Sequence, residues 1–239
     1  MTDWGLPKIR SGNTQRESYK SDTIVLITGK MRLPEDLQNQ VIDEIRNLFP
    51  FDYIICDIPE DEYEKYDQKL VQIYKHYDTV QKLPEQYKHV IRIRNDVVLD
   101  KTNNAKDTYR SLICNLEICL EELQKKGIVI GVQHMSARRL INKWTSENRS
   151  EKRQIGDFMI FHPRDKIMNP RKVFGSSEKE QARLGEDLHW AWGDVFSVNY
   201  RNIVHVSLPL KVYRHTSESE WWLGVRIPSY NKVIKKEKK

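Results

Sequence analysis

The chain has 239 residues, of which 38% are hydrophobic and 31% are charged, values typical of a globular protein rather than a disordered one. No apolar run approaches the roughly 20 residues that span a bilayer, and the first 22 residues lack the apolar segment of a secretory signal. We therefore expect a cytoplasmic protein whose three cysteines are reduced thiols. The net charge of +6 is compatible with nucleic acid, anionic lipid or a phosphorylated substrate, and does not choose among them.

The first half of the chain alternates predicted strands with predicted helices. Short apolar runs predict buried strands over Thr23–Thr28, Asp52–Cys56 and His89–Arg94. Apolar side chains three or four residues apart predict a helix over Pro34–Leu48 and a second, with an aromatic stripe, over residues 60–83. Strands that alternate with helices indicate a parallel, doubly wound sheet.

The second half is less regular. Ala105–Lys126 is a predicted helix that ends at Gly127, and Ile128–Val132 is a predicted strand. Asp157–Phe161 predicts a further strand and Ser177–Trp192 a further helix. The other segments are expected to be a basic helix or loop, a loop or lid, and two strands close to a hairpin: His134–Asn148, His162–Ser177, and Asp194–Tyr200 with Ile203–Arg214. We expect an irregular leader over residues 1–22, one α/β domain over 23–230 and a basic, flexible tail over 231–239.

The third predicted strand carries the strongest functional signal. Because strand side chains alternate between two faces, Ile91 and Ile93 would face one layer of the protein. Arg92, Arg94 and Asp96 would share the other face, at the carboxyl end of the strand. Carboxylates bind Mg²⁺ or Mn²⁺ and arginine binds phosphate, so these side chains suit a phosphate–metal site. The alternative is a solvated edge strand with ordinary surface charges.

Signatures of several other enzyme classes are absent from the sequence. Nothing matches the P-loop GxxxxGK[ST], no GxGxxG follows the first strand, and there is no GxSxG elbow. No paired cysteine and histidine set has the spacing of a structural zinc site.

Dispersed segments of the chain resemble nucleotide-sugar glycosyltransferases of the GT-A fold, in particular short viral and bacterial enzymes similar to lipopolysaccharide-synthesis transferases. The segments are, in order, TIVLITGKMR, RIRND, GDFMIF, a helix centred on Glu186, and strands that end in KVYR. The resemblance spans Thr23–Arg214. It implies a Rossmann-type, mostly parallel sheet with flanking helices and a C-terminal mixed or antiparallel portion. Where that family carries Asp-x-Asp, this chain has Asn95-Asp96 with a single carboxylate, which bears on metal dependence.

The resemblance also implies roles for individual residues. A donor, expected to be a UDP-sugar, would be bound by Thr28, Gly29, Arg32, Arg92, Arg94 and Asp96. A Mn²⁺ or Mg²⁺ ion would be held by Asp96 and His189. Asp157 would face the donor sugar or the acceptor hydroxyl, and Glu186 or Asp187 would be the general base of an inverting reaction. The structural alternatives are a helix-face acid for Glu186, a turn cap for Asp157 and a core histidine for His189.

The basic side chains of the sequence bear on the identity of the acceptor substrate. A resemblance to DNA glycosyltransferases of T-even-type phages implies hydroxymethylated cytosine, exposed or flipped from the duplex, as the favoured acceptor. The candidates for DNA phosphate contacts are Arg138, Arg139, Lys143, Arg164, Lys166, Arg171 and Lys172. Two alternatives stay open: a cell-surface glycan or lipopolysaccharide as acceptor, and a non-catalytic nucleic-acid-binding protein that needs neither Asp96 nor Glu186. The oligomeric state is not determined by the sequence.

Overall fold

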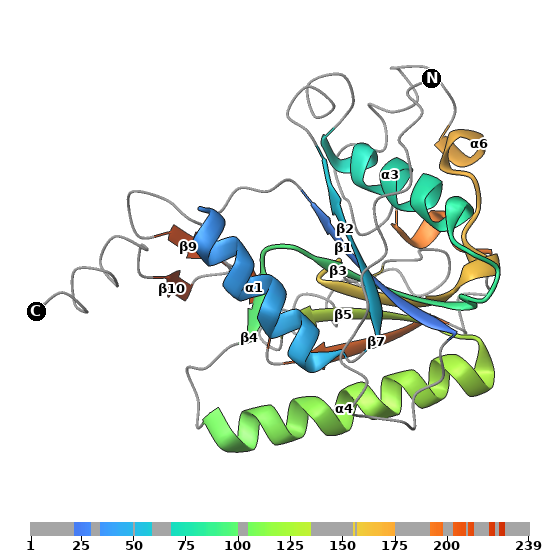
Figure 1. Ribbon diagram of the computed structural model, residues 1–239. Coiled ribbons are helices and arrows are strands. Elements are labelled where there is room, and N and C mark those ends of the chain that lie inside the picture. The colour runs from blue at the N-terminus through green and yellow to red at the C-terminus, as the bar shows by residue number, and fades with distance from the viewer. Residues whose placement is uncertain are drawn as a thin grey trace, which may run out of the picture.

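Six strands form a central sheet in the computed structural model (Figure 1), in the order Asp52–Asp57 (β2), Thr23–Gly29 (β1), His89–Arg94 (β3), Met159–Pro163 (β6), Val129–His134 (β5) and Ile203–Leu208 (β7). Two small antiparallel pairs lie outside it: Val97–Leu99 (β4) with Leu210–Val212 (β8), and Glu220–Trp222 (β9) with Val225–Ile227 (β10). The helices are Glu35–Leu48 (α1), Gln68–Lys82 (α3), Ala105–Lys126 (α4) and Pro170–Phe174 (α6), with a 3₁₀ turn at Arg164–Lys166 (η2). The structure describes residues 22–29, 34–49, 51–58, 68–99, 105–134, 155, 157–174, 192–197, 203–208, 210–212, 220–222 and 225–227.

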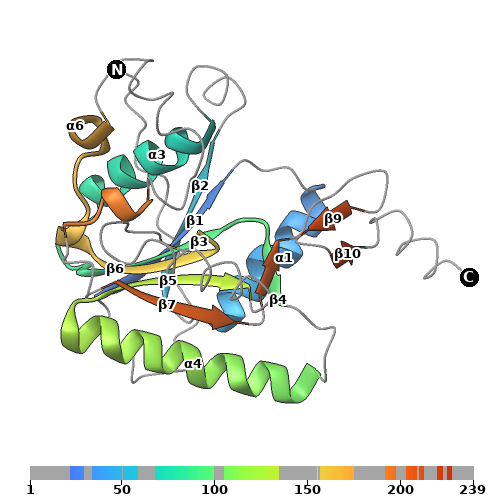
Figure 2. The ribbon, with the colours of Figure 1, turned by 180° about the vertical axis from the view of Figure 1, so that it is seen from behind.

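Helices cover both faces of the sheet, so the protein has three layers. Helices α1 and α4 pack on one face, against strand residues that include Ile91 and Ile93. Helix α3 and the segment that contains α6 pack on the other face, together with Trp192. Figure 2, the view from behind, shows α3 and α6 on one side of the sheet and α4 on the opposite side. The alternation of apolar side chains along β3 therefore reaches two separate cores, as the sequence predicts for a central strand.

Several predicted elements are confirmed. Helix α4 has the predicted bounds, and Gly127 follows it with a φ of 61°, the left-handed conformation of a helix C′ residue. Helix α1 begins one residue after Pro34. In the described part of the aromatic-striped helix, Leu70, Ile73 and Val80 are buried. Apart from Asp22, the predicted leader and the predicted tail lie outside the described residues.

The alternative of a solvated edge strand is wrong for β3. Strand β3 pairs in parallel with β1 on one side and antiparallel with β6 on the other. Its Val90, Ile91, Arg92 and Ile93 are all buried. The charged side chains of this strand therefore sit in or beside the core, and each needs a partner there.

The central sheet is mostly parallel and has helices on both faces, as expected, but one of its strands runs against the others. Strand β6 runs antiparallel in the middle of the sheet, between β3 and β5, whereas the antiparallel portion was expected at the C-terminal end. The C-terminal strand β7 instead pairs in parallel with β5. Every residue of β6 is buried, and a fully buried strand has the same apolar pattern in either direction, so its sequence does not reveal its orientation.

The start of the predicted hairpin differs from the prediction, and its turn at Arg201-Asn202 lies outside the described residues. Residues 192–194 are helical, and Phe196 forms only an isolated bridge with Ile167. The predicted strand Ile203–Arg214 is divided between β7 in the central sheet and β8, which pairs with β4. Trp192, Val195 and Phe196 are buried in the α3-side core, and this packing outweighs their preference for a strand.

The predicted loop or lid over His162–Ser177 contains regular structure in its described part. It includes the end of β6, the η2 turn and helix α6, with Ile167 and Phe174 buried in the core. The Pro and Gly residues of this stretch suggested a loop, but its apolar side chains anchor it against α3.

Candidate functional site

A backbone hydrogen bond joins the carboxyl end of strand β1 to the turn that follows strand β3. Thr28 is in register with Arg94, and the Asn95 backbone N–H donates to the Thr28 carbonyl at 3.1 Å. Gly29 has a φ of 146°, and a Cβ at this position would collide with the Asn95 side-chain amide. The Gln38 amide of α1 donates to the Asn95 carbonyl at 2.9 Å. This end of the sheet is thus a fixed platform that requires glycine at position 29.

Arg94 joins two carboxylates on this platform. Its Nε and Nη2 donate to the two oxygens of Asp96 at 2.8 and 2.7 Å, and its Nη1 donates to Asp157 Oδ2 at 2.9 Å. The side chains of Arg94 and Asp96 are 20% and 17% exposed, so a ligand in solvent can reach them. Burial alone would lower the pKa of the Arg94 guanidinium, but the carboxylates of Asp96 and Asp157 outweigh it and raise that pKa. Arg94 therefore stays charged.

Asp157 comes to this cluster from a segment more than sixty residues away in the chain. It forms an isolated bridge with Val132, and the next residue, Phe158, accepts the Arg94 backbone N–H at 3.1 Å. The Arg92 Nη1 donates a short hydrogen bond to the Asp157 carbonyl. Backbone and side-chain bonds together fix the position of the Asp157 carboxylate.

Arg92 is fully buried and holds three segments together. Its Nε donates to Thr28 Oγ1 and its Nη2 to Gln72 Oε1, both at 2.9 Å. Its guanidinium lies over the Trp192 ring, with Cζ 4.8 Å from the ring centroid. Arg92 thus positions Thr28 and Asp157, while Arg94 is the arginine that reaches the partly exposed cluster.

The structure brings together six of the predicted site residues and leaves four outside its described part. Thr28, Gly29, Arg92, Arg94, Asp96 and Asp157 converge at the carboxyl ends of β1 and β3. The four that lie outside the described residues are Arg32, Glu186, Asp187 and His189. Their roles remain predictions.

Sequence reasoning missed three contributors to this cluster. Asn95 was noted only as a departure from Asp-x-Asp, whereas its side chain packs against Gly29. Gln72 and Trp192 contact Arg92 from distant segments. The one local signal was the i, i+2 spacing of Arg94 and Asp96, because such residues share a face of a strand.

The described residues do not fit a divalent cation. Among them, no three or more His, Cys, Asp or Glu side chains gather, so an ion here would have to be held by one or two carboxylates together with substrate phosphates. Both oxygens of Asp96, the predicted metal ligand, already accept hydrogen bonds from Arg94. His189, the second predicted ligand, lies outside the described residues.

The predicted DNA-contact residues are only partly described. Arg171 forms a two-pronged ion pair with Asp78 at 2.9 Å for both bonds, and Lys166 pairs with the adjacent Asp165. Arg164 donates to the carbonyls of Pro84 and Gln81 near the end of α3. Lys172 is exposed. Arg138, Arg139 and Lys143 lie outside the described residues.

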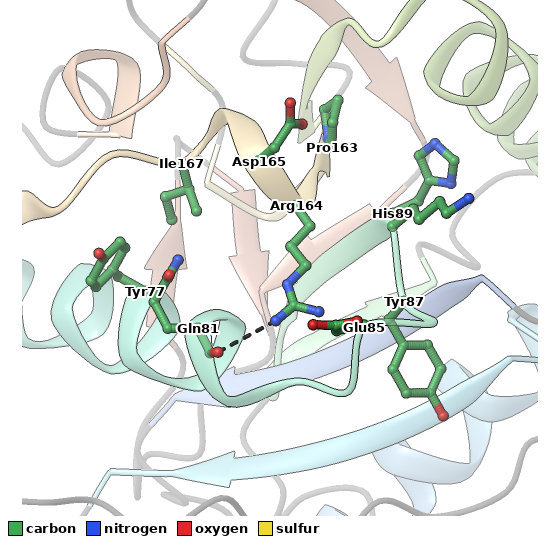
Figure 3. A pocket seen from close by; sticks show the side chains of 10 residues that line it. Tyr77, Gln81, Glu85, Tyr87, His89, Pro163, Arg164, Asp165 and Ile167 are labelled. Carbon is green, nitrogen blue, oxygen red and sulfur yellow. Dashed lines mark hydrogen bonds between the residues drawn. The ribbon is translucent and has the colours of Figure 1, made fainter.

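A cavity of about 500 Å³ lies at the other end of β3 (Figure 3). Its walls include His89, the first residue of β3, and Arg164, whose guanidinium reaches the Gln81 carbonyl. His89 and Arg94 are the two ends of the six-residue strand β3, about 17 Å apart. The cavity is therefore not part of the Arg94 cluster.

No protein-family model matches the chain, and no curated protein matches it. Among solved structures, a glycosyltransferase involved in the glycosylation of the major capsid of PBCV-1 is similar at 11% identity, with a TM-score of 0.39, over 77% of this chain and 81% of that chain. A197 from STIV is similar at 13% identity, with a TM-score of 0.33, over 82% and 86% of the two chains. Mouse xyloside xylosyltransferase 1 in its apo form is similar at 11% identity, with a TM-score of 0.30, over 75% and 79%. Since each TM-score is below 0.5, these similarities do not assign the chain to a family.

Proposed function

We propose that the chain is a glycosyltransferase that uses a nucleotide-sugar donor, bound at the carboxyl ends of β1 and β3. The observation that carries this proposal is the partly exposed cluster in which Arg94 joins Asp96 and Asp157. Open α/β sheets bind ligands at the carboxyl ends of their parallel strands, which is where this cluster lies. The resemblance of TIVLITGKMR, RIRND and GDFMIF to GT-A enzymes supplies the reaction class.

The groups in the cluster suit the chemistry of sugar transfer. The leaving diphosphate gains negative charge, and a fixed guanidinium such as that of Arg94 is suited to stabilise it. The acceptor hydroxyl loses a proton as it attacks, and a carboxylate can accept that proton. In this proposal Asp157 faces the sugar or the acceptor hydroxyl, and Glu186 or Asp187 is the base of an inverting reaction. Arg32 binds a phosphate, and Arg92 acts by holding Thr28 and Asp157 in place.

Donor binding tests the proposal directly. We expect one member of a panel of UDP-, GDP-, CDP- and dTDP-sugars to raise the melting temperature, since a ligand at about a hundredfold excess over its Kd stabilises a protein by about 2.7 kcal/mol. Asp96→Asn should weaken that binding at least about tenfold, or about 1.4 kcal/mol. Asp165→Asn is the matched control, because Asp165 is an exposed aspartate in the cavity at the other end of β3. The proposal is lost if no donor binds, or if both variants bind the donor like the wild type.

The acceptor is a separate part of the proposal. We favour hydroxymethylated cytosine in DNA, on the grounds of the resemblance to DNA glycosyltransferases of T-even-type phages and of basic side chains such as the exposed Lys172. Labelled sugar should then pass from the donor to hydroxymethylated DNA and not to unmodified DNA. Transfer to a lipopolysaccharide extract alone would replace DNA with a cell-surface glycan. DNA binding with no donor binding would favour a non-catalytic nucleic-acid-binding protein.

A further inference from the structure

We infer that Arg94 takes the place that a divalent cation would occupy between Asp96 and Asp157, so that donor binding at this site needs no metal ion. The donor part of this inference rests on the proposed function. The part that concerns Arg94 and the two carboxylates rests on their geometry alone.

The geometry is that of a cation shared by two carboxylates. Arg94 donates through all three of its nitrogens, twice to Asp96 and once to Asp157, at 2.7 to 2.9 Å. The two carboxylates come from different segments, as the ligands of a bridging ion often do. Only 7% of the Asp157 side chain is exposed, so its charge needs a cation close by.

A metal ion would have to displace Arg94 to bind this carboxylate pair. The guanidinium cannot lose its proton to make room, because its pKa lies above the whole range in which proteins fold. A metal ion placed beside it would be repelled by the like charge of Arg94 at a site only partly open to solvent. The fully buried Arg92 adds a second positive charge nearby, since its Nη1 bonds the Asp157 carbonyl. Positive charge at this site is therefore already supplied by side chains.

Arg94 retains capacity for a ligand. A guanidinium has five N–H bonds, and the bonds to Asp96 and Asp157 use three of them. Within the described part of the chain, the second N–H of Nη1 and that of Nη2 do not donate to a protein acceptor. Phosphate oxygens are suitable acceptors for such a pair.

Metal affinity tests the inference without any donor. Mn²⁺ binding is measured from the electron paramagnetic resonance signal of the free ion, in the wild type, Arg94→Gln and the double variant Arg94→Gln/Asp157→Asn. We expect the wild type to have no Mn²⁺ site that depends on Asp96. Arg94→Gln should bind Mn²⁺ at least about tenfold more tightly than the wild type does, and the double variant should lose this gain in Mn²⁺ affinity. Arg46→Gln is the matched control, because Arg46 pairs with a single exposed carboxylate, Asp43, at 3.0 Å; it should gain no site.

The second measurement uses the nucleotide-sugar found in the donor panel. Wild-type donor affinity should be the same in excess EDTA and in Mn²⁺, whereas Arg94→Gln should bind the donor only with Mn²⁺. Mn²⁺ binding by the wild type that Asp96→Asn abolishes would overturn the inference, and so would a folded Arg94→Gln that gains no Mn²⁺ site. If Arg94→Gln does not fold, as judged by circular dichroism, the wild-type and Asp96→Asn titrations decide the question. If no donor binds at all, the proposed function fails while the Mn²⁺ titrations still decide the role of Arg94.

Discussion

Two buried histidines lie in the α3-side core, close to Arg92 and Trp192. His76 Nε2 and His162 Nε2 are 2.8 Å apart, and His162 Nδ1 is 2.8 Å from the Pro163 carbonyl. Since a carbonyl only accepts, His162 carries its proton on Nδ1 and accepts at Nε2, so His76 donates from its Nε2. Burial lowers the pKa of both imidazoles, so both are neutral in the folded protein, and a proton added to either would disturb this arrangement.

This histidine pair predicts that stability falls in mild acid. Burial lowers the pKa of His162 from 6.5 to about 4, and burial and the neighbouring His162 lower the pKa of His76. Between these values the unfolded chain binds protons that the folded protein does not, so stability is full above pH 6.5 and is lost as the pH falls toward 4. From pH 7 to pH 5 we expect His162 alone to reduce the free energy of unfolding by about 2 kcal/mol.

Urea denaturation at a series of pH values measures this loss. His162→Gln should lower stability at pH 7 but should make the dependence between pH 7 and 5 shallower, because one titrating group is gone. A wild-type stability that does not change over this interval, or an undiminished slope in the variant, would contradict the assignment of neutral histidines.

At the scale of elements, helix α6 is attached to α3 by charge as well as by apolar packing. Arg171 pairs with both oxygens of Asp78, and its guanidinium lies 5.1 Å from the centroid of the Tyr74 ring. Phe174 at the end of α6 is buried in the same core. The described part of the predicted loop or lid, His162–Ser177, is therefore packed against helix α3. The Arg171 guanidinium is engaged in this contact.

We accordingly predict that Arg171→Ala acts on stability more than on DNA affinity. Loss of the two-pronged pair and of the ring contact should lower the free energy of unfolding by about 1–2 kcal/mol. The adjacent Lys172→Ala is the control, and a change within about 0.5 kcal/mol is expected there because Lys172 is exposed. Thermal denaturation and DNA titration are measured on both variants. A loss of DNA affinity in Arg171→Ala at unchanged stability would reverse this assignment.

At the scale of the whole molecule, the most protected part is the middle of the central sheet. Strand β3 has a neighbour on each side and a core on each face, and the bonds around Thr28, Arg92 and Asp157 tie it to β1 and to the segment before β6. Within the described ranges, none of the helices has the length and apolar character that a membrane span requires. The candidate site lies at the end of β3, and we expect this strand to be among the most stable parts of the fold.

Hydrogen exchange checks this distribution of stability. Amides of β1 and β3 should exchange only through global unfolding, with protection equal to the free energy from denaturation. Amides of the two-stranded pair β9 and β10 should exchange through smaller openings, because an isolated pair of strands is only marginally stable. Equal protection of β3 and β9 would show that the pair is part of the same cooperative unit.

Local patterns in the sequence were sufficient for β1, α1, β2, β3 and α4, and for part of the site, but not for the short strand β4. The bounds of α1 and α4 and the alternation of Ile91 and Ile93 with Arg92 and Arg94 follow from helical and strand periodicity, which depends only on neighbouring residues. Arg94 and Asp96 are close in sequence, but Asp96 lies in the turn after β3, so strand alternation by itself does not account for their ion pair.

The tertiary structure alone decided which segments meet. The antiparallel direction of β6, the helical start of the 192–197 segment and the pairing of β7 with β5 depend on contacts between residues far apart in the chain. Arg92 and Arg94 look alike in the sequence, yet one is sealed beneath Trp192 and the other joins two carboxylates at the partly exposed end of the sheet. A periodic pattern identifies the face of a strand, but the strands, helices and charges packed on that face are fixed only when the whole chain has folded around it.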